Sequence, residues 1–178
     1  MKENTCCFFG HRTITETEEL KSNLCKIIEM LIVEKQVDTF LFGSKSRFNS
    51  LCLELVTKYK EKYPHIKRIY VRAEYPHISQ KYKNYLLESY EDTYYPEKII
   101  NSGRAVYVER NYEMINDSHF CVVYYDESNA PTTRKSGTKI AFDYAVKQRK
   151  QVIKLPQAIQ LGFYPNITAK QYNSPQGE

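Results

Sequence analysis

The sequence predicts an α/β protein: a Rossmann-like three-layer sandwich with a mostly parallel sheet of about five strands. Short β-branched or aromatic runs alternate with segments whose apolar residues recur at the helical period. Such alternation is typical of parallel strands covered by helices on both faces. The 178 residues, 42% of them hydrophobic, are enough for one domain with a real core. We expect this domain to span residues 1–156, and residues 157–178 to form a polar C-terminal tail or extension.

Five segments are expected to be strands, because each is a compact apolar run with turn-forming residues nearby. In chain order they are Thr5–Phe9, Thr39–Phe42, Ile66–Val71, Phe120–Tyr125 and Gln151–Leu155. The long stretch from Glu74 to Ala105 is rich in tyrosine. It is expected to be irregular, apart from a short helix over Ser79–Tyr90.

Apolar stripes at helical spacing predict the remaining helices, and we interpret these stripes as core. Thr15 and Glu18 form a capping box ahead of the first stripe, which consists of Leu20, Leu24, Ile27, Ile28 and Leu31. The second stripe consists of Phe48, Leu51, Cys52, Leu55, Val56 and Tyr59. A third helix, over Val108–Asp117, has the stripe Val108, Tyr112 and Ile115. The last, over Gly137–Lys150, has the stripe Ile140, Ala141, Tyr144 and Ala145.

Charge and composition restrict the classes of ligand. Lys and Arg number 26 and Asp and Glu 21, and the net charge of +5 suits an anionic small ligand or weak nucleic-acid contact without requiring either. Tyrosine, with 16 copies, supplies rings that stack on bases. The five cysteines contain no CxxC pair and fit the reduced thiols of a cytoplasmic protein. No signal-peptide pattern or apolar run near about 18 residues occurs, so we expect no membrane partner, and we assign no metal site.

The carboxyl ends of the strands are the expected ligand site. Ligands of a doubly wound sheet bind at this edge, where the strand order reverses, and the first and fourth expected strands meet there. The first strand ends in Gly10-His11-Arg12. The glycine permits a tight turn or a close ligand approach, and the two cationic donors suit an anion. In the alternative interpretation, Arg12 pairs with a surface carboxylate and His11 caps the following turn.

Three further segments are expected at the same edge. The turn after the second strand, Gly43–Arg47, opens a helix and suits anion binding, although Ser46 fits a helix N-cap equally well. Ser136-Gly137-Thr138 opens the last helix behind Arg134 and Lys135, and Arg110 lies on the helix before the fourth strand. The candidate ligand-binding residues are Gly10, His11, Arg12, Gly43, Ser44, Lys45, Arg47, Arg110, Asn111, Asp126, Ser136, Gly137 and Thr138. The sequence contains neither the Walker motif GxxxxGK[ST] nor, after the first strand, the pattern GxGxxG, so we do not expect a standard dinucleotide-dehydrogenase site.

With these residues in place, the chain resembles the SLOG superfamily, which gathers DprA/Smf, LOG-type and YpsA-like proteins, and within it the YpsA-like branch. The ordered motifs are the strand into Gly-His-Arg at Cys7–Arg12, the Arg-Asn-x-x-Met of Arg110–Met114 before Asp117-Ser118, and the Gly137-Thr138 helix start. The resemblance implies a Rossmann-like protein that binds a nucleotide-derived ligand of the ADP-ribose or NAD-derived type. It also implies a sensor or binding role in bacterial defence or stress signalling, and a homo-oligomer.

The chain departs from the LOG-type relatives, which cleave nucleoside monophosphates at the glycosidic bond. Their Pro-Gly-Gly-x-Gly-Thr-x-x-Glu run corresponds to Thr133–Ala141, where cations replace glycines and Ala141 stands in the place of the acidic residue. Such a reaction needs a carboxylate, and Asp143 lies on another side of the helix. We therefore assign no catalytic residue.

Three functions stay open. The first is a binding protein for a phosphate-bearing nucleotide derivative, with tyrosines of residues 75–95 closing over the base. The alternative is an N-glycosidic hydrolase or phosphoribohydrolase that uses Arg110 with a carboxylate such as Asp126 or Glu127. The third is nucleic-acid binding through cations and aromatic rings, which is the least favoured because the chain lacks a dense basic stripe.

Overall fold

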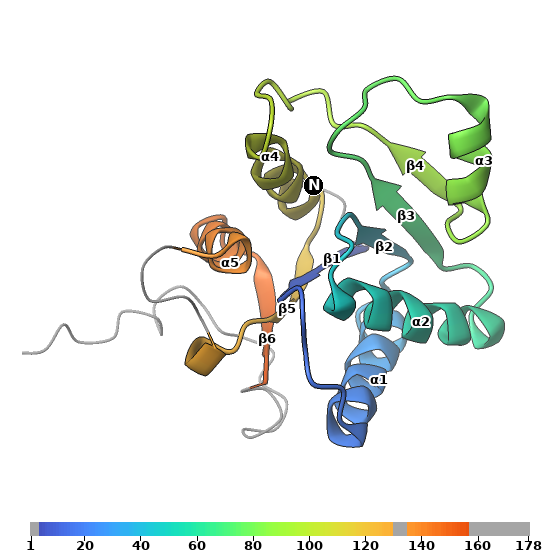
Figure 1. Cartoon of the computed structure of the whole chain (residues 1–178). Helices are drawn as coiled ribbons and strands as arrows, with labels where there is room; N and C mark the ends of the chain where they lie inside the picture. The colour runs from blue at the N-terminus through green and yellow to red at the C-terminus, as the bar shows by residue number, and fades with distance from the viewer. Residues whose placement is uncertain (1–3, 130–134, 157–178) are drawn as a thin grey trace, which may run out of the picture.

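The computed structural model describes residues 4–129 and 135–156. These residues form a six-stranded sheet in the order β4-β3-β2-β1-β5-β6, in which every pair of neighbouring strands is parallel. The strands are β1 (Thr5–Gly10), β2 (Thr39–Phe42), β3 (Lys67–Val71), β4 (Asp92–Tyr94), β5 (Phe120–Tyr124) and β6 (Gln151–Leu155). The predicted Rossmann-like α/β class is therefore confirmed (Figure 1).

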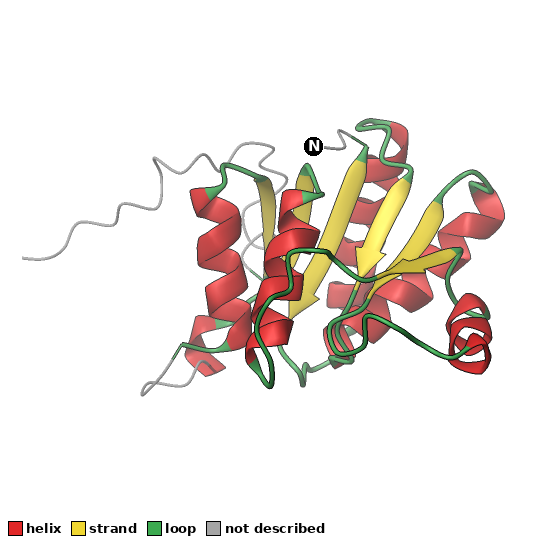
Figure 2. Ribbon diagram, turned by 90° about the horizontal axis from the view of Figure 1, so that it is seen from above, coloured by secondary structure: helices red, strands yellow, loops and turns green. Residues whose placement is uncertain are grey.

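Helices cover both faces of this sheet, as Figures 1 and 2 show. On one face lie α1 (Glu18–Val33) and α2 (Arg47–Lys62), and on the other α4 (Ala105–Asn116) and α5 (Gly137–Lys147). The short α3 (Gln80–Leu87) contacts the edge strand β4, and a 3-10 turn, η1 (Glu127–Asn129), follows β5. Among the described residues, no helix has both the length and the apolar character needed to cross a bilayer.

The alternation of side chains along each strand creates two cores. On β1, Phe8 packs with Phe40 and Phe42 of β2 beneath α1 and α2. Its neighbour Phe9 points to the opposite face and packs in the cluster that holds Met114 of α4 and Phe142 of α5. Consecutive residues of β1 thus pack in the cores on opposite faces of the sheet. For this reason the sequence of the strand is a continuous apolar run.

Two local predictions need correction. The sheet has a sixth strand, β4, inside the stretch that we expected to be irregular, because three residues are too short to show a period and owe their geometry to pairing with β3. The first helix begins at Glu18 with Thr17 as its N-cap, whose side chain accepts a hydrogen bond from the Leu20 amide. The capping box expected from Thr15 and Glu18 is therefore wrong, because the N-cap lies two residues later.

The buried face of α4 also differs from the predicted stripe. Val108 and Tyr112 are only half-buried, whereas Val106, Met114 and Ile115 are buried together with the charged Arg110. The helix begins three residues earlier than expected, at Ala105. On α5 the expected Ala141 and Ala145 are buried, but Phe142 is buried with them, and Ile140 and Tyr144 are half-buried.

Candidate functional site

The reversal of strand order lies at β1, which pairs with β2 on one side and with β5 on the other. At its carboxyl end, the Asp126 amide donates a 3.0 Å hydrogen bond to His11 Nε2, and the His11 amide donates to the Tyr124 carbonyl at 3.2 Å. The imidazole also contacts the rings of Tyr124 and Tyr125. His11 therefore joins the tips of β1 and β5, and brings two of the predicted site residues, His11 and Asp126, into contact.

Gly10 has a packing role that the sequence did not indicate. A Cβ at this position would lie 2.5 Å from Cδ1 and 2.7 Å from Cγ of Phe48 on α2. Phe48 is fully buried, so its ring has little room to move. The glycine thus permits close packing of α2 against β1, and its expected role in a close ligand approach stays a prediction.

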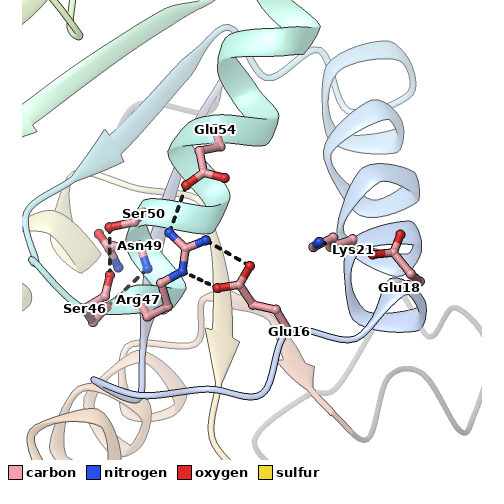
Figure 3. A network of polar contacts seen from close by, with 8 residues as sticks. All are labelled: Glu16, Glu18, Lys21, Ser46, Arg47, Asn49, Ser50 and Glu54. Atoms are coloured by element: carbon pink, nitrogen blue, oxygen red, sulfur yellow. Dashed lines mark hydrogen bonds and ion pairs between the residues drawn. The ribbon is translucent and has the colours of Figure 1, made fainter.

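The loop after β1 is tied to the start of α2 by main-chain and side-chain contacts. The Arg47 amide donates to the Arg12 carbonyl at 2.8 Å, and Ser46 is the N-cap of α2. The Arg47 side chain pairs with Glu16 and Glu54, as Figure 3 shows. The hydrogen bonds that it donates to Glu16 are the main cause that raises the pKa of Arg47. Its guanidinium therefore has two carboxylate partners, and a ligand role for Arg47 stays a prediction.

Asn49 organises the tip of β2, and sequence reasoning missed it. Its side chain is buried, donates from Nδ2 to the Phe8 carbonyl at 3.1 Å, and accepts long hydrogen bonds from the Gly43 and Ser44 amides at 3.5 and 3.4 Å. These amides point into the protein, so a ligand here would be held mainly by side chains. The signal in the sequence was an amide residue on the apolar side of a helix, beside Phe48.

Arg110 is the most unusual residue at this edge. Its side chain lies at the tips of β2 and β3, with an exposed fraction of 4%. Nη1 donates to the carbonyl of Gly43 and, at 3.3 Å, to that of Val71, and Nε donates to Asn111 Oδ1 at 2.9 Å. A Cβ on Gly43 would lie 2.6 Å from Nη1, so the glycine leaves the space that this guanidinium occupies.

Within residues 4–129 and 135–156, no carboxylate lies within ion-pair distance of Arg110. No ion pair to Arg110 occurs there, and Nη2 has no hydrogen-bond partner in that part of the chain. Burial lowers the pKa of Arg110 to about 10, an effect that nearby Tyr70 and Glu74 oppose. The side chain is therefore still a cation at neutral pH, with one nitrogen available to an anion.

Arg12 and Lys45 add positive charge to the neighbouring loops. Both are exposed, and within the described residues their side chains have no hydrogen-bond or ion-pair partner. Ser44, also predicted, accepts a hydrogen bond from the Ser46 amide at 3.0 Å. The contacts at His11, Asn49 and Arg110 thus join the tips of β1, β2 and β5 with α4. We call His11, Arg12, Ser44, Lys45 and Arg110 the carboxyl-edge site.

The start of α5 lies at the same edge by topology, because a helix that follows a parallel strand begins at that strand's carboxyl end. Ser136 is its N-cap and accepts a hydrogen bond from the Lys139 amide. Gly137 is exposed and Thr138 is half-exposed. Within the described residues, no hydrogen bond or ion pair joins these three residues to the tips of β1 or β2.

The lysines near the start of α5 already have a carboxylate partner. Lys135 and Lys139 both form ion pairs with Asp143, whose carboxylate accepts a hydrogen bond from each lysine. Arg134, which we expected beside them, lies outside the described residues. The sequence also missed Lys154 of β6, whose buried side chain pairs with Glu127 at 2.6 Å and lies over the rings of Tyr125 and Phe142.

The carboxylates considered for a hydrolase have structural partners. Asp126 Oδ1 accepts hydrogen bonds from the Ser128 amide at 3.0 Å and from its hydroxyl at 2.6 Å, and Glu127 pairs with Lys154. Ala141 is buried in the core. A search of the described residues finds no group of three or more His, Cys, Asp or Glu side chains arranged to hold a metal ion.

Comparison with known proteins adds information at the level of the fold. No protein-family model matches the chain, and no curated protein matches it. Among solved structures, the chain is similar to DNA processing protein A from Helicobacter pylori, a protein described with a single-stranded DNA binding mode. The TM-score is 0.56 and the identity 16%, and the match covers 87% of this chain and 66% of that one. The two proteins share a fold.

This likeness agrees with the fold that the sequence predicts. The match therefore supports the Rossmann-like fold that the six-stranded parallel sheet shows. Nothing in it concerns the YpsA-like branch in particular. At 16% identity the match shows the fold, and the ligand has to be argued from the site.

Proposed function

We propose that this protein binds a phosphate-bearing nucleotide or nucleotide-derived ligand, of the ADP-ribose or NAD-derived type, at the carboxyl-edge site. The observation that carries this proposal is Arg110: a buried guanidinium at the strand tips whose described partners are neutral oxygens. A buried cation without a counter-charge is costly. A phosphate oxygen at Nη2 would neutralise it through a charge-assisted hydrogen bond.

The neighbouring loops suit the same ligand. Exposed Arg12 and Lys45 would contact further phosphoryl oxygens, and both flank the point where β1 meets β2. Ligands of open α/β sheets bind at this edge. The finer parts of the proposal, namely the YpsA-like branch, a sensor role in bacterial defence or stress signalling, and a homo-oligomer, rest on the sequence resemblance alone.

Single-stranded DNA is a second candidate ligand. The observation that favours it is the shared fold with DNA processing protein A. Exposed cations such as Arg12 and Lys45, together with exposed tyrosines such as Tyr75, are the side chains that hold single strands by charge and base stacking. This candidate would use the same edge of the sheet.

Calorimetric titration of the purified chain with AMP, ADP-ribose and NAD tests the first proposal. We expect micromolar affinity for at least one of them. The double variant Arg12→Ala/Lys45→Ala should weaken it at least about tenfold, because two charge-assisted contacts are removed. Lys35→Ala is the matched control, since this exposed lysine follows α1 at the opposite edge of the sheet. Equal affinities for the double variant and the control would contradict the site.

Titration with oligothymidylates of increasing length separates the two candidates. A nucleic-acid site predicts affinity that rises with length and falls steeply with salt, whereas a mononucleotide site predicts neither. Chromatography of the AMP mixture after incubation tests the hydrolase alternative directly, because cleavage of the glycosidic bond would release adenine.

A further inference from the structure

Three exposed apolar side chains lie near the start of α4. Tyr107, in the first turn of α4, has an exposed fraction of 41%. Tyr75, in the loop after β3, is 61% exposed, and Ile100, in the loop before α4, is 84% exposed. We call these three residues the apolar rim. Single exposed apolar residues are ordinary, but these three come from segments that one buried cluster holds together, and exposed apolar side chains gathered in this way suit a binding surface.

A small core holds the three segments together. Ala73, Ile99 and Val106 form a buried cluster apart from the two main cores. Each of its members lies within two residues of a member of the apolar rim, so the cluster brings the loop after β3, the loop before α4 and the first turn of α4 to one place. The rim residues project from this support into solvent.

Polar contacts hold both loops in place. Glu109 of α4 accepts hydrogen bonds from the amides of Ile100 and Asn101 at 3.2 and 3.1 Å. Arg72 Nη1 donates to the carbonyls of Tyr75 and Pro76 at 2.6 and 3.1 Å. The exposed side chains therefore extend from an ordered main chain, which lowers the entropy cost of using them for binding.

The segments that carry the apolar rim are the ones that position Arg110, namely α4 and the loop after β3. Tyr107 and Arg110 are three residues apart on one helix, so they lie on neighbouring sides of it, about 4.5 Å apart along the axis, with Tyr107 exposed and Arg110 buried. Because α4 runs antiparallel to the strands, Tyr107 is the one nearer to the carboxyl edge. On the other side, Arg110 donates to the Val71 carbonyl at the end of β3, from which the loop to Tyr75 departs.

We infer that the apolar rim binds the aromatic base of the ligand whose phosphate contacts Arg110. The ligand then lies with its phosphate toward the tips of β1 and β2 and its base over the start of α4, against Tyr107, Tyr75 and Ile100. This inference rests on the proposed function and adds to it the position of the base and the residues that distinguish a nucleotide from a sugar phosphate.

Two probes that differ only in the base test it: AMP and ribose 5-phosphate, titrated into the full chain. The wild type should bind AMP more tightly. Tyr107→Ala should weaken AMP binding about tenfold, the loss expected for one stacking contact, and leave ribose 5-phosphate within about twofold. Tyr107→Phe, which keeps the ring, should retain AMP affinity. Arg110→Lys should weaken both probes.

Tyr85→Ala is the matched control, because this tyrosine of α3 is similarly exposed, at 64%, but lies outside the rim. If Tyr107→Ala and Tyr75→Ala both leave the ratio of the two affinities at its wild-type value while Arg110→Lys weakens both probes, the base position is wrong and the proposed function stands. If neither probe binds the wild type, both fail. A change of oligomeric state in Tyr107→Ala, measured by light scattering, with unchanged AMP affinity would assign the rim to contact between chains.

Discussion

Single residues at the carboxyl edge show how a small change in side-chain volume would alter the structure. Gly10 and Gly43 both follow or end strands, and neither has the positive φ that Gly103 has. A side chain at position 10 would clash with Phe48 of α2, and a side chain at position 43 would clash with Arg110. The two glycines therefore have different consequences, one for stability and one for the position of a buried cation.

Substitution of Gly10 tests the packing role. Gly10→Ala places a Cβ against the buried Phe48 ring, and we expect a loss of about 1–3 kcal/mol in the free energy of unfolding. Urea denaturation measures it. Gly137→Ala is the control, because nothing lies within 4 Å of a Cβ there, and its change should stay within about 0.5 kcal/mol. Equal effects of the two substitutions would mean that Phe48 moves aside freely.

At the scale of elements, β4 depends on its neighbour for its geometry. The three-residue strand pairs with β3, and the preceding Glu91 fastens it there by accepting hydrogen bonds from Arg68: from the amide at 2.6 Å and from Nη2 at 2.6 Å. Lys60 of α2 lies 3.6 Å from the same carboxylate. One side chain thus joins β4, β3 and α2.

The pH dependence of stability tests this contact. Partial burial raises the pKa of Glu91, but the hydrogen bonds from Arg68 outweigh it and leave the pKa below the ordinary value of 4.5. A carboxyl with a lowered folded-state pKa stabilises the fold above its unfolded-state pKa, and this contribution is lost as the pH falls through the folded-state value. The stability difference between the wild type and Glu91→Gln should therefore be largest at neutral pH and shrink below about pH 4.5.

Urea denaturation at a series of pH values measures this difference. Glu88→Gln, at the exposed end of α3, is the control and should show a small difference at every pH. A difference for Glu91→Gln that does not change between neutral and acidic pH would show that the Arg68 contact does not stabilise the fold.

At the scale of the whole molecule, the two cores enclose nearly all the thiols. Cys6 and Cys52 lie in the core beneath α1 and α2, and Cys7 and Cys121 lie in the core beneath α4 and α5, each with an exposed fraction of 0%. Burial raises the pKa of Cys6, Cys52 and Cys121. Cys25 of α1 is the half-buried one.

The thiols therefore report on the integrity of both cores. We expect the native protein to react rapidly with Ellman's reagent at no more than one thiol, Cys25, because a buried thiol is protonated and inaccessible. All five should react after denaturation, and Cys25→Ser should remove the rapid phase. Rapid reaction of further thiols in the native state would mean that one of the helical layers opens readily.

The sequence by itself determined the class of fold and the edge of the sheet that carries the polar tips. Runs such as Thr39–Phe42 and Gln151–Leu155 match β2 and β6 residue for residue, because strand and helix periods are local properties of the chain. The meeting of β1 and β5 also followed from the usual strand order of a doubly wound sheet. That the candidate residues bind a ligand remains a proposal.

Only the tertiary structure decided which charged side chains are free. On the sequence, Arg47 and Arg110 are both arginines on amphipathic helices. In the fold, Arg47 forms ion pairs with Glu16 and Glu54, whereas Arg110 is buried and donates to carbonyls at two strand tips. Glu16 is 31 residues from Arg47 and Gly43 is 67 residues from Arg110 in the chain, and no local pattern encodes which surfaces the folded backbone brings together.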